Sequence, residues 1–336
     1  MDMFNYTARA SRNAANKEIL LSYIYNYDLG ETARTSHNLS RECLVPGDYA
    51  RFVPTNSMIE AYLTKDGKIW NPADAKTYED VFKDRDPRMV QSILPPGTAW
   101  EGLEDGDITS DDNSIFLYPK FINDKRGCMT YSGYYMRKYV EPSTVKYVGH
   151  DDNDIVILRY AEVLLNYAEA KEMLGALTQT DLDRSINLLR DRVGMARMEL
   201  GNLPEGSDIR TEIRRERRIE LFFEGGGLRY DDLMRWAEGD MLMKPWNSIY
   251  IGSKDVAYDT NGDGVKDLEV VDKKPSSTPS GVFLVDLSKS NYYTFKDGRL
   301  YITNENSWTD RKYLHPIPKA ALVKNPNLKQ NYGWEQ

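Results

Sequence analysis

The chain has 336 residues, 40% of them hydrophobic, which is enough to bury a sizeable core in one large domain or two interlocked ones. Its formal net charge of −8 argues against nucleic-acid binding, which needs a basic face opposite the phosphates. No apolar run reaches the roughly 18 residues of a membrane-spanning helix, and the first residues carry neither the basic nor the apolar part of an export signal. We therefore expect any export or lipidation signal to lie outside this chain.

The cysteines and histidines offer little for metal or histidine chemistry. Cys43 and Cys128 have no second cysteine or histidine at ligand spacing, which favours two free buried thiols over a disulfide or a metal pair. His37, His150 and His315 lie far apart in the sequence, so histidine-based catalysis has few candidates.

The first 150 residues divide into a short helical segment and a long irregular region. Residues 16–27 are predicted to be helical, because Ile19, Leu20, Tyr23 and Ile24 would share one helical face. After residue 30 the helical pattern is lost.

Turn signals such as Pro46-Gly47 and Asp105-Gly106 break up the region from 31 to 150. Only two short helices fit there, over 57–63 and 78–83. Long loops inside a compact protein are usually functional, so we expect this region to present the ligand site.

A helical hairpin is predicted after residue 154. Apolar residues recur with the helical period at Leu158, Ala161, Leu165 and Ala168, and Gly175 ends this helix. A second helix is expected from Thr180, with Asp183 as a capping-box variant, to Gly194. Two antiparallel helices with small residues between them are typical of a tetratricopeptide-like unit, and no second copy follows at a 34-residue period.

The next predicted helix, 208–224, has an unusual charge pattern. Glu212, Glu216, Glu220 and Glu224 fall on one stripe and arginines lie roughly opposite, although like charges four residues apart destabilise an isolated helix. Isoleucines and phenylalanines fill the gaps, which predicts that the helix is largely buried. Its charges then need partners on other segments, and we interpret them as a structural ion-pair network rather than a catalytic site. A shorter helix over 231–238 follows, then loops up to a final tail from residue 313.

Two motifs that resemble catalytic sites have plainer explanations. The glycines at 225–227 lack the preceding strand and the following Lys-Ser/Thr of a phosphate-binding loop. Asp231 and Asp232 would point about 100° apart on a helix, and Glu216 and Glu220 sit among arginines, which favours ionised structural carboxylates. We therefore expect no enzyme activity.

The segment 259–267 has most of the pattern of a calcium loop. Oxygen ligands fall at Asp259, Asn261, Asp263 and Asp267, a glycine stands at the sixth position, and Val265 offers its carbonyl at the seventh. The twelfth position is a valine instead of the bidentate glutamate, and no flanking helices are evident. The alternative is an Asp/Asn/Gly-rich turn without metal. We favour a structural Ca²⁺ and expect no other cofactor.

Aromatic residues are the unusual feature of the composition, with 23 Tyr, 9 Phe and 6 Trp. Rings on loops beside polar residues suit sugar binding, because the ring face packs on sugar C–H groups while its neighbours bond hydroxyls. Each ring singly is better explained as cover for the loop region's own small core. Of the whole set we expect one or two to face a ligand, and the candidates are Trp70, Trp100, Tyr118, Tyr131 and Tyr134.

Several segments together resemble the SusD/RagB family. They are Leu-Arg-Tyr-Ala-Glu-Val-Leu-Leu-Asn-Tyr-Ala-Glu-Ala over 158–170, the arginine–glutamate run over 213–225, Leu-Arg-Tyr-Asp-Asp-Leu-Met-Arg-Trp over 228–236, Tyr-Leu-His-Pro-Ile-Pro over 313–318 and the closing segment 325–334. The resemblance covers most of the chain. Tyr332 stands where the family often has proline, and family members usually carry a lipoprotein signal and further helices before the point where this chain begins.

The resemblance implies a mainly α fold of tetratricopeptide-like hairpins, with a large loop-rich region and minor β-hairpins. It divides the chain into a helical segment of the base (1–30), a ligand-presenting region (31–150) and a C-terminal helical region (151–336). It implies capture of an oligosaccharide at the external face of a Bacteroidetes-like outer membrane by a lipid-anchored protein. Delivery to a SusC-like TonB-dependent transporter would follow, and no catalytic residue is carried over.

The main rival is an interaction scaffold that binds a protein partner, or a non-sugar nutrient, through its helical repeats. Replacing Trp70 and Trp100 with alanine separates the two, because glycan retention is lost only under the first hypothesis.

Overall fold

The structure is a computed structural model, and every structural statement below concerns the residues that it describes. These are residues 4, 16–27, 36–43, 51–96, 98, 130–141, 144, 148–259, 264–266, 268–277, 281–290, 293–302 and 307–335.

The N-terminal segment forms a strand rather than the predicted helix. Strand β1 (Ile19–Tyr23) pairs antiparallel with β2 (Ile155–Arg159), with Ile19 opposite Arg159 and Tyr23 opposite Ile155. A short apolar run does not by itself distinguish helix from strand. Here the deciding partner, β2, lies far away in the sequence, so the expectation of a helix over 16–27 was wrong.

Strand β2 leads directly into a helical hairpin. Helix α4 (Tyr160–Met173) is followed by α5 (Gln179–Asp183) and α6 (Ile186–Val193), which are separated by a break at Ser185. The second arm begins two residues earlier than predicted. The side chain of Thr178 accepts the Asp181 backbone N–H, and the Asp181 carboxylate accepts that of Thr178, a complete capping box.

Gly194 ends the hairpin as predicted, in the left-handed conformation that favours glycine (φ 69°). Between the arms and α7 lies an apolar cluster that includes Leu165, Ala168, Leu182 and Ile186. The hairpin predicted from periodicity is therefore confirmed as a packed unit.

The arginine–glutamate segment is helix α7 (Ile209–Glu220), and α8 (Leu228–Arg235) follows it. Asp208 caps α7 by accepting the Thr211 backbone N–H. Helix α7 ends four residues short of the predicted 224, in a turn that contains Phe223 and three glycines with positive φ. Helix α8 starts at the end of this turn, three residues before the predicted 231.

The described part of the first hundred residues contains three small helices: α1 (Leu39–Cys43), α2 (Asn56–Ala61) and α3 (Pro87–Ser92). Helix α2 confirms the helix expected over 57–63, whereas the segment expected over 78–83 has only a 3-10 turn, Asp80–Phe82. Further 3-10 turns among the residues that the structure describes are Pro72–Asp74, Gly239–Met243, Leu287–Lys289 and Asp310–Tyr313.

Strands replace the loops expected after α8. An antiparallel sheet has the order β3 (Trp246–Tyr250), β7 (Arg299–Ile302), β6 (Tyr293–Lys296), and β4 (Leu268–Val271) pairs in parallel with β5 (Phe283–Asp286). The hairpin of β6 and β7 turns at Asp297-Gly298, both with positive φ. These strands have only four or five residues, and the β3–β7 pair has a register shift between Asn247 and Tyr250, so their alternation is hard to read in the sequence.

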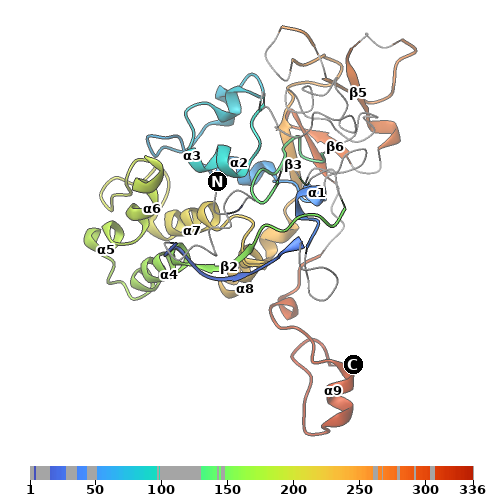
Figure 1. The fold of residues 1–336 in the computed structure, drawn as a ribbon. Helices are drawn as coiled ribbons and strands as arrows, with labels where there is room; N and C mark the ends of the chain where they lie inside the picture. The colour runs from blue at the N-terminus through green and yellow to red at the C-terminus, as the bar shows by residue number, and fades with distance from the viewer. Residues whose placement is uncertain are drawn as a thin grey trace.

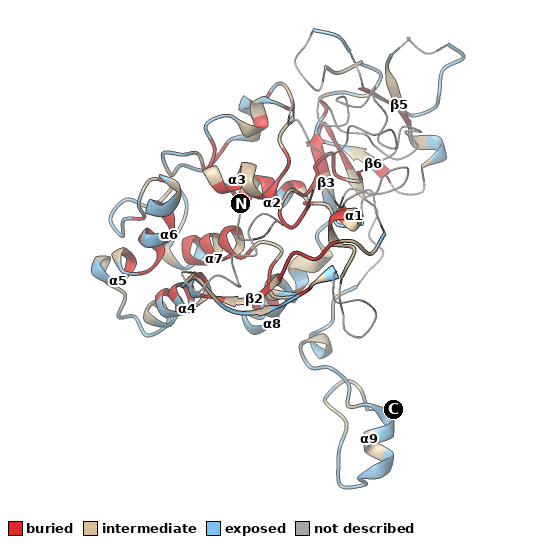
Figure 2. Cartoon of the chain, in the orientation of Figure 1, coloured by how far each residue is buried: buried red, intermediate tan, exposed pale blue. Residues whose placement is uncertain are grey.

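The helices α4 to α7 gather at one side of the molecule and the strands β3, β5 and β6 at another, with α2 and α3 between them (Figure 1). Buried residues run along α7, α2 and β3 (Figure 2). The main apolar core joins these parts, with Ile59 from α2, Ile219 from α7 and Ile249 from β3. Helix α7 is therefore largely buried, as its sequence predicted.

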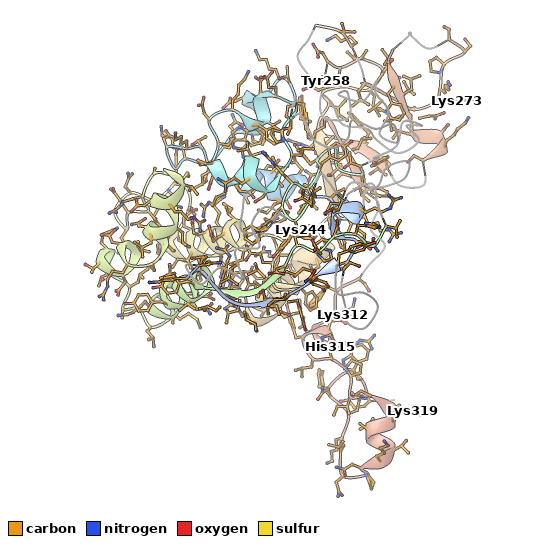
Figure 3. The ribbon with its side chains drawn as sticks, viewed as in Figure 1. Lys244, Tyr258, Lys273, Lys312, His315 and Lys319 are labelled. Carbon is orange, nitrogen blue, oxygen red and sulfur yellow. The ribbon has the colours of Figure 1, made fainter. Side chains whose placement is uncertain are left out.

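The C-terminal segment with α9 (Lys319–Lys324) extends away from the body. Lys312, His315 and Lys319 lie along it, far from Tyr258 at the opposite end of the molecule (Figure 3). Among the described residues no helix combines the length and the apolar character that a membrane crossing requires.

Candidate functional site

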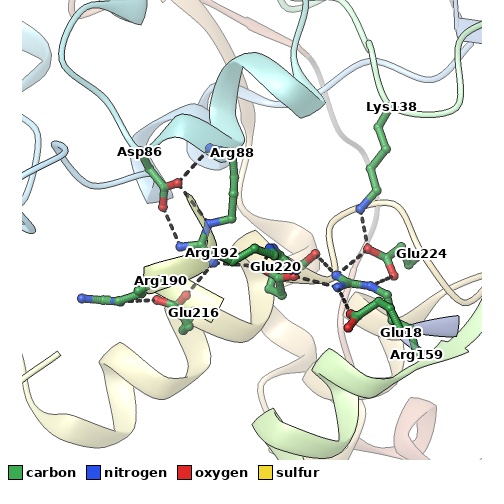
Figure 4. Close-up of polar contacts among 10 residues, drawn as sticks. All are labelled: Glu18, Asp86, Arg88, Lys138, Arg159, Arg190, Arg192, Glu216, Glu220 and Glu224. Atoms are coloured by element: carbon green, nitrogen blue, oxygen red, sulfur yellow. Dashed lines mark hydrogen bonds and ion pairs between the residues drawn. The ribbon is translucent and has the colours of Figure 1, made fainter. Parts of the chain in front are cut away.

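A buried network of charges surrounds α7 (Figure 4). Glu216 accepts hydrogen bonds from Arg88 Nη1 at 2.5 Å and Arg190 Nε at 2.8 Å. Glu220 accepts from Arg88 Nη1 at 2.9 Å and from Arg192 Nη2 at 2.8 Å. The arginines come from α3 and α6, so the carboxylates of one helix join two other elements.

Arg159, at the end of β2, extends the network toward the glycine turn. Its Nη1 lies 2.7 Å from Glu220 Oε1 and its Nε 2.6 Å from Glu224 Oε2. The same guanidinium reaches Glu18, next to β1, at 3.0 Å, and Lys138 also pairs with Glu224. One arginine thus ties β1, β2 and α7 together.

The charges of this network balance, and they hold Glu216 and Glu220 ionised. Five cations (Arg88, Lys138, Arg159, Arg190, Arg192) face five carboxylates (Glu18, Asp86, Glu216, Glu220, Glu224). Burial by itself would raise the pKa of Glu216 and Glu220, but the adjacent arginines lower the pKa of both below the ordinary value. A carboxyl with a lowered pKa is unsuited to act as a general acid at neutral pH. The predicted structural ion-pair network is confirmed.

A second buried group of charges links α7 to α8. The Arg217 Nε lies 2.8 Å from Asp232 Oδ2, whereas Asp231 is exposed. The two aspartates therefore diverge, as predicted. Arg235 and the indole N–H of Trp236 both donate to Glu169 of α4, at 2.5 and 2.6 Å.

Two of the predicted ligand-binding rings are core residues. Trp70 is 8% exposed, and the guanidinium of Arg85 lies 3.9 Å from its ring centroid. Tyr134 is 1% exposed and donates to Asn56 Oδ1 at 3.0 Å. A ring covered in this way cannot stack on a sugar. For both residues the burial corrects the expectation and supports the plainer explanation.

The structure does bring Trp70 and Tyr134 together. They line one small cavity of about 10 Å³ with Tyr78, Tyr250, Tyr258 and Arg299, a space that holds about one water molecule. Tyr131 is half-buried against the same core. The remaining two candidates, Trp100 and Tyr118, lie outside the described residues.

Strand β3 carries two exposed rings that the sequence reasoning missed, and one of them, Tyr250, lines this cavity. Tyr250 is 44% exposed, with the Arg299 guanidinium 5.6 Å from its ring centroid, and Trp246 is 51% exposed. Gly298 leaves room for the Tyr250 ring, because a Cβ there would lie 2.3 Å from Tyr250 Cε2. The available signal was a Trp and a Tyr four residues apart just after the recognised helices.

A larger, mainly apolar cavity of about 560 Å³ lies against the glycine turn. Phe52, Met58 and Tyr139 line one part, and Phe222 and Phe223 another. Its volume is in the range of small-molecule sites. Its lining offers few polar partners for sugar hydroxyls, so it does not by itself indicate a sugar site.

Part of the calcium-like segment can be placed. The Asp259 carboxylate accepts the Gly264 backbone N–H at 2.8 Å, with Gly264 at φ 88°. This turn fits both a calcium loop and a metal-free Asx-type turn. Val265 is exposed, and the other three predicted ligands, Asn261, Asp263 and Asp267, lie outside the described residues.

No other metal group or disulfide emerges from the described residues. No group of three or more His, Cys, Asp or Glu side chains there could hold a metal ion. Cys43 is buried and unbridged, and burial raises the pKa of its thiol. Cys128 lies outside the described residues.

The hairpin, the central charged helix and the balanced network define a tetratricopeptide-like helical protein whose most conspicuous charges are structural. A model of the SusD family matches residues 17–334, and the chain belongs to this family. The SusD-like protein P38 of Formosa agariphila is 32% identical over 268 residues, which cover 74% of this chain and 44% of that protein.

Solved structures agree with this assignment. A SusD-like carbohydrate binding protein from Bacteroides fragilis matches with a TM-score of 0.65 and 26% identity, over 98% of this chain and 56% of that one. A second SusD-like protein from the same species matches with a TM-score of 0.59 and 22% identity, over 96% and 55% of the two chains, and shows the fold alone. The chain spans about half the length of the relatives it matches.

Proposed function

We propose that this protein binds oligosaccharides without cleaving them. The observation that carries the proposal is the membership of the SusD family, together with the likeness to a SusD-like carbohydrate binding protein over nearly the whole chain. The paired state of Glu216 and Glu220 supports a non-catalytic role, because neither carboxyl is free to transfer a proton. Incubation of the purified protein with polysaccharides should release no reducing sugar, and sustained release would contradict the proposal.

The ring platform that we propose for the sugar is Tyr250, with Trp246 on the same strand. Tyr250 is exposed and lies beside the Arg299 guanidinium, so a ring face and a hydrogen-bond donor are close together. Trp100 and Tyr118 remain proposed contacts. Trp70 and Tyr134 would support the platform from below rather than touch the sugar.

A glycan array followed by calorimetry on one bound oligosaccharide tests the platform. Tyr250→Ala should weaken binding at least about fivefold, since an aromatic contact contributes about 1 kcal/mol. Trp100→Ala, as a separate variant, should weaken binding as well. Tyr332→Ala is the matched control, because Tyr332 is 82% exposed in the C-terminal segment. Equal affinity of all three variants and the parent would refute the platform, and an empty array would refute the function.

We further propose that the protein acts at the external face of an outer membrane, anchored by lipid, and passes its ligand to a SusC-like TonB-dependent transporter. Family membership supports this partner and place. Co-purification of the transporter with the tagged protein from the native membrane tests it. Recovery of the protein from the cytoplasm alone would contradict it.

One observation favours the rival, a scaffold that binds a protein or a non-sugar nutrient. Tyr160, Val163 and Tyr167 are exposed along α4, and their spacing places them on one face of the helix. An apolar helix face of this kind suits a partner helix. Val163→Asp should abolish partner capture under this rival and leave glycan affinity unchanged.

A further inference from the structure

An open cavity of about 340 Å³ lies between α2, α7 and α8, outside the aromatic platform. Its lining includes Ser57, Glu60, Arg214, Arg215, Arg218 and Arg229. Four arginines around one cavity are unusual in a chain whose net charge is −8. A concave space of this size can hold a small ligand or one sugar unit.

Two of the four arginines have carboxylate partners. Arg214 pairs with Glu238, and Arg215 Nε lies 3.1 Å from Glu212 Oε1. The other lining carboxylate, Glu60, lies 3.4 Å from Arg299. The acidic groups at the cavity are therefore already engaged.

Arg218 and Arg229 differ from them. Among the described residues, neither has a carboxylate within 4.0 Å, and the one hydrogen bond of Arg218 goes from Nη2 to Ser57 Oγ at 3.0 Å. The guanidinium of Arg229 lies 5.7 Å from the Trp236 ring centroid. This pair contrasts with the network on the other side of α7, where five cations meet five carboxylates.

The pKa values of both guanidinium groups are lower than the ordinary value. Burial, and then the neighbouring Arg229 cation, lower the pKa of Arg218 to about 10. Burial also lowers the pKa of Arg229. Asp232 and Glu238 attract Arg229, and Glu60 attracts Arg218, only from beyond pairing distance. A desolvated cation without a paired carboxylate is unfavourable, and an anion that reaches it reduces the penalty. A guanidinium has five N–H donors in a fork that matches carboxylate and sulfate oxygens.

We propose that this cavity is an oxyanion-binding site, in which Arg218 and Arg229 hold a carboxylate or sulfate group and Ser57 positions the Arg218 fork. The group could reach the cavity on an acidic oligosaccharide or as a free inorganic anion. Both share the chemistry that the arginines recognise. The cavity adjoins the aromatic platform through the contact between Glu60 and Arg299, but neither Arg218 nor Arg229 belongs to the platform.

Calorimetric titrations of the whole chain distinguish these sources. The probes are sodium sulfate, an oligogalacturonate and a neutral gluco-oligosaccharide of the same length. We expect sulfate and oligogalacturonate to bind, and Arg218→Met and Arg229→Met each to weaken both about tenfold or more, as expected for one charged hydrogen-bonding partner. Arg197→Met is the matched control, because Arg197 is exposed and paired with Asp191.

Each result of these titrations has its own interpretation. Tighter binding of oligogalacturonate than of sulfate identifies the acidic sugar as the ligand, and sulfate binding alone identifies a free anion. Anion binding that survives both replacements, or that is absent from the parent protein, overturns the proposal. If one of the two variants fails to fold, the other carries the test, because both arginines are half-buried and neither is paired with a carboxylate among the described residues. Unchanged binding of the neutral sugar in these variants separates this site from the glycan platform.

Discussion

At the scale of single residues, Glu220 holds more of the molecule together than any other carboxylate described above. It contacts Arg88 of α3, Arg159 of β2 and Arg192 of α6. A buried ion pair contributes little net stability against an apolar replacement, but removal of one partner leaves buried charges uncompensated. The network is therefore sensitive to the loss of a single member.

Glu220→Gln should lower the free energy of unfolding by about 3–5 kcal/mol, because three arginines lose their shared carboxylate. Urea unfolding measures the change. Asp191→Asn serves as the control, since Asp191 pairs with Arg197 at the surface, and we expect no measurable loss there. Similar midpoints for the two variants would show that burial of the network does not matter.

The contacts of single side chains could be predicted from the sequence only in part. The glutamate stripe of α7 required partners on other segments, and that requirement was correct. The partners themselves could not be read, because Arg88 lies 128 residues before Glu216. For Trp70 the deciding fact was the position of Arg85 over its ring, which only the fold reveals. Tyr250 was missed because its position opposite Arg299 follows from the pairing of β3 with β7.

At the scale of elements, periodicity predicted those that are long and locally determined. Helices α4 and α7 and the stop at Gly194 follow from spacing and caps within a few residues. Strands β1 and β3 depend on partners far along the chain, and β4 to β7 have only four residues each, so their short apolar runs were read as helix or loop. Helix α5 begins two residues earlier than predicted because the capping box is formed by Thr178 and Asp181 and not by Thr180 and Asp183.

The loop over 259–267 is the element whose chemistry can be tested directly. We expect calorimetry to show uptake of one Ca²⁺, with a rise in melting temperature as the ion stiffens the loop. Asp259→Asn should abolish the uptake, because Asp259 would supply the first ligand. Asp272→Asn is the control, since Asp272 pairs with Lys254. Absence of uptake by the parent would assign the segment to a metal-free turn.

At the scale of the whole molecule, the buried glutamates make stability depend on pH. The pKa values of Glu216 and Glu220 are lower in the folded protein than the ordinary value of 4.5. The stability that they contribute is present above about pH 4.5 and is lost as the pH falls through their folded values.

We therefore expect the urea midpoint to fall steadily below about pH 4.5, and less steeply in Glu220→Gln, which lacks one of the titrating groups. Circular dichroism during urea titrations between pH 7 and pH 3 measures the effect. A midpoint that stays constant over this range would contradict the lowered pKa values.

The pairing of β1 with β2 also has a consequence for biogenesis. Glu18 and Arg159, which meet where the two strands begin and end, are 141 residues apart. Closing so long a loop is slow, so β1 stays unpaired early in folding. Leu20 and Leu21 would meanwhile lie on an open strand edge, which invites association with other chains. We expect this segment to need protection by a chaperone until residues 155–159 pair with it.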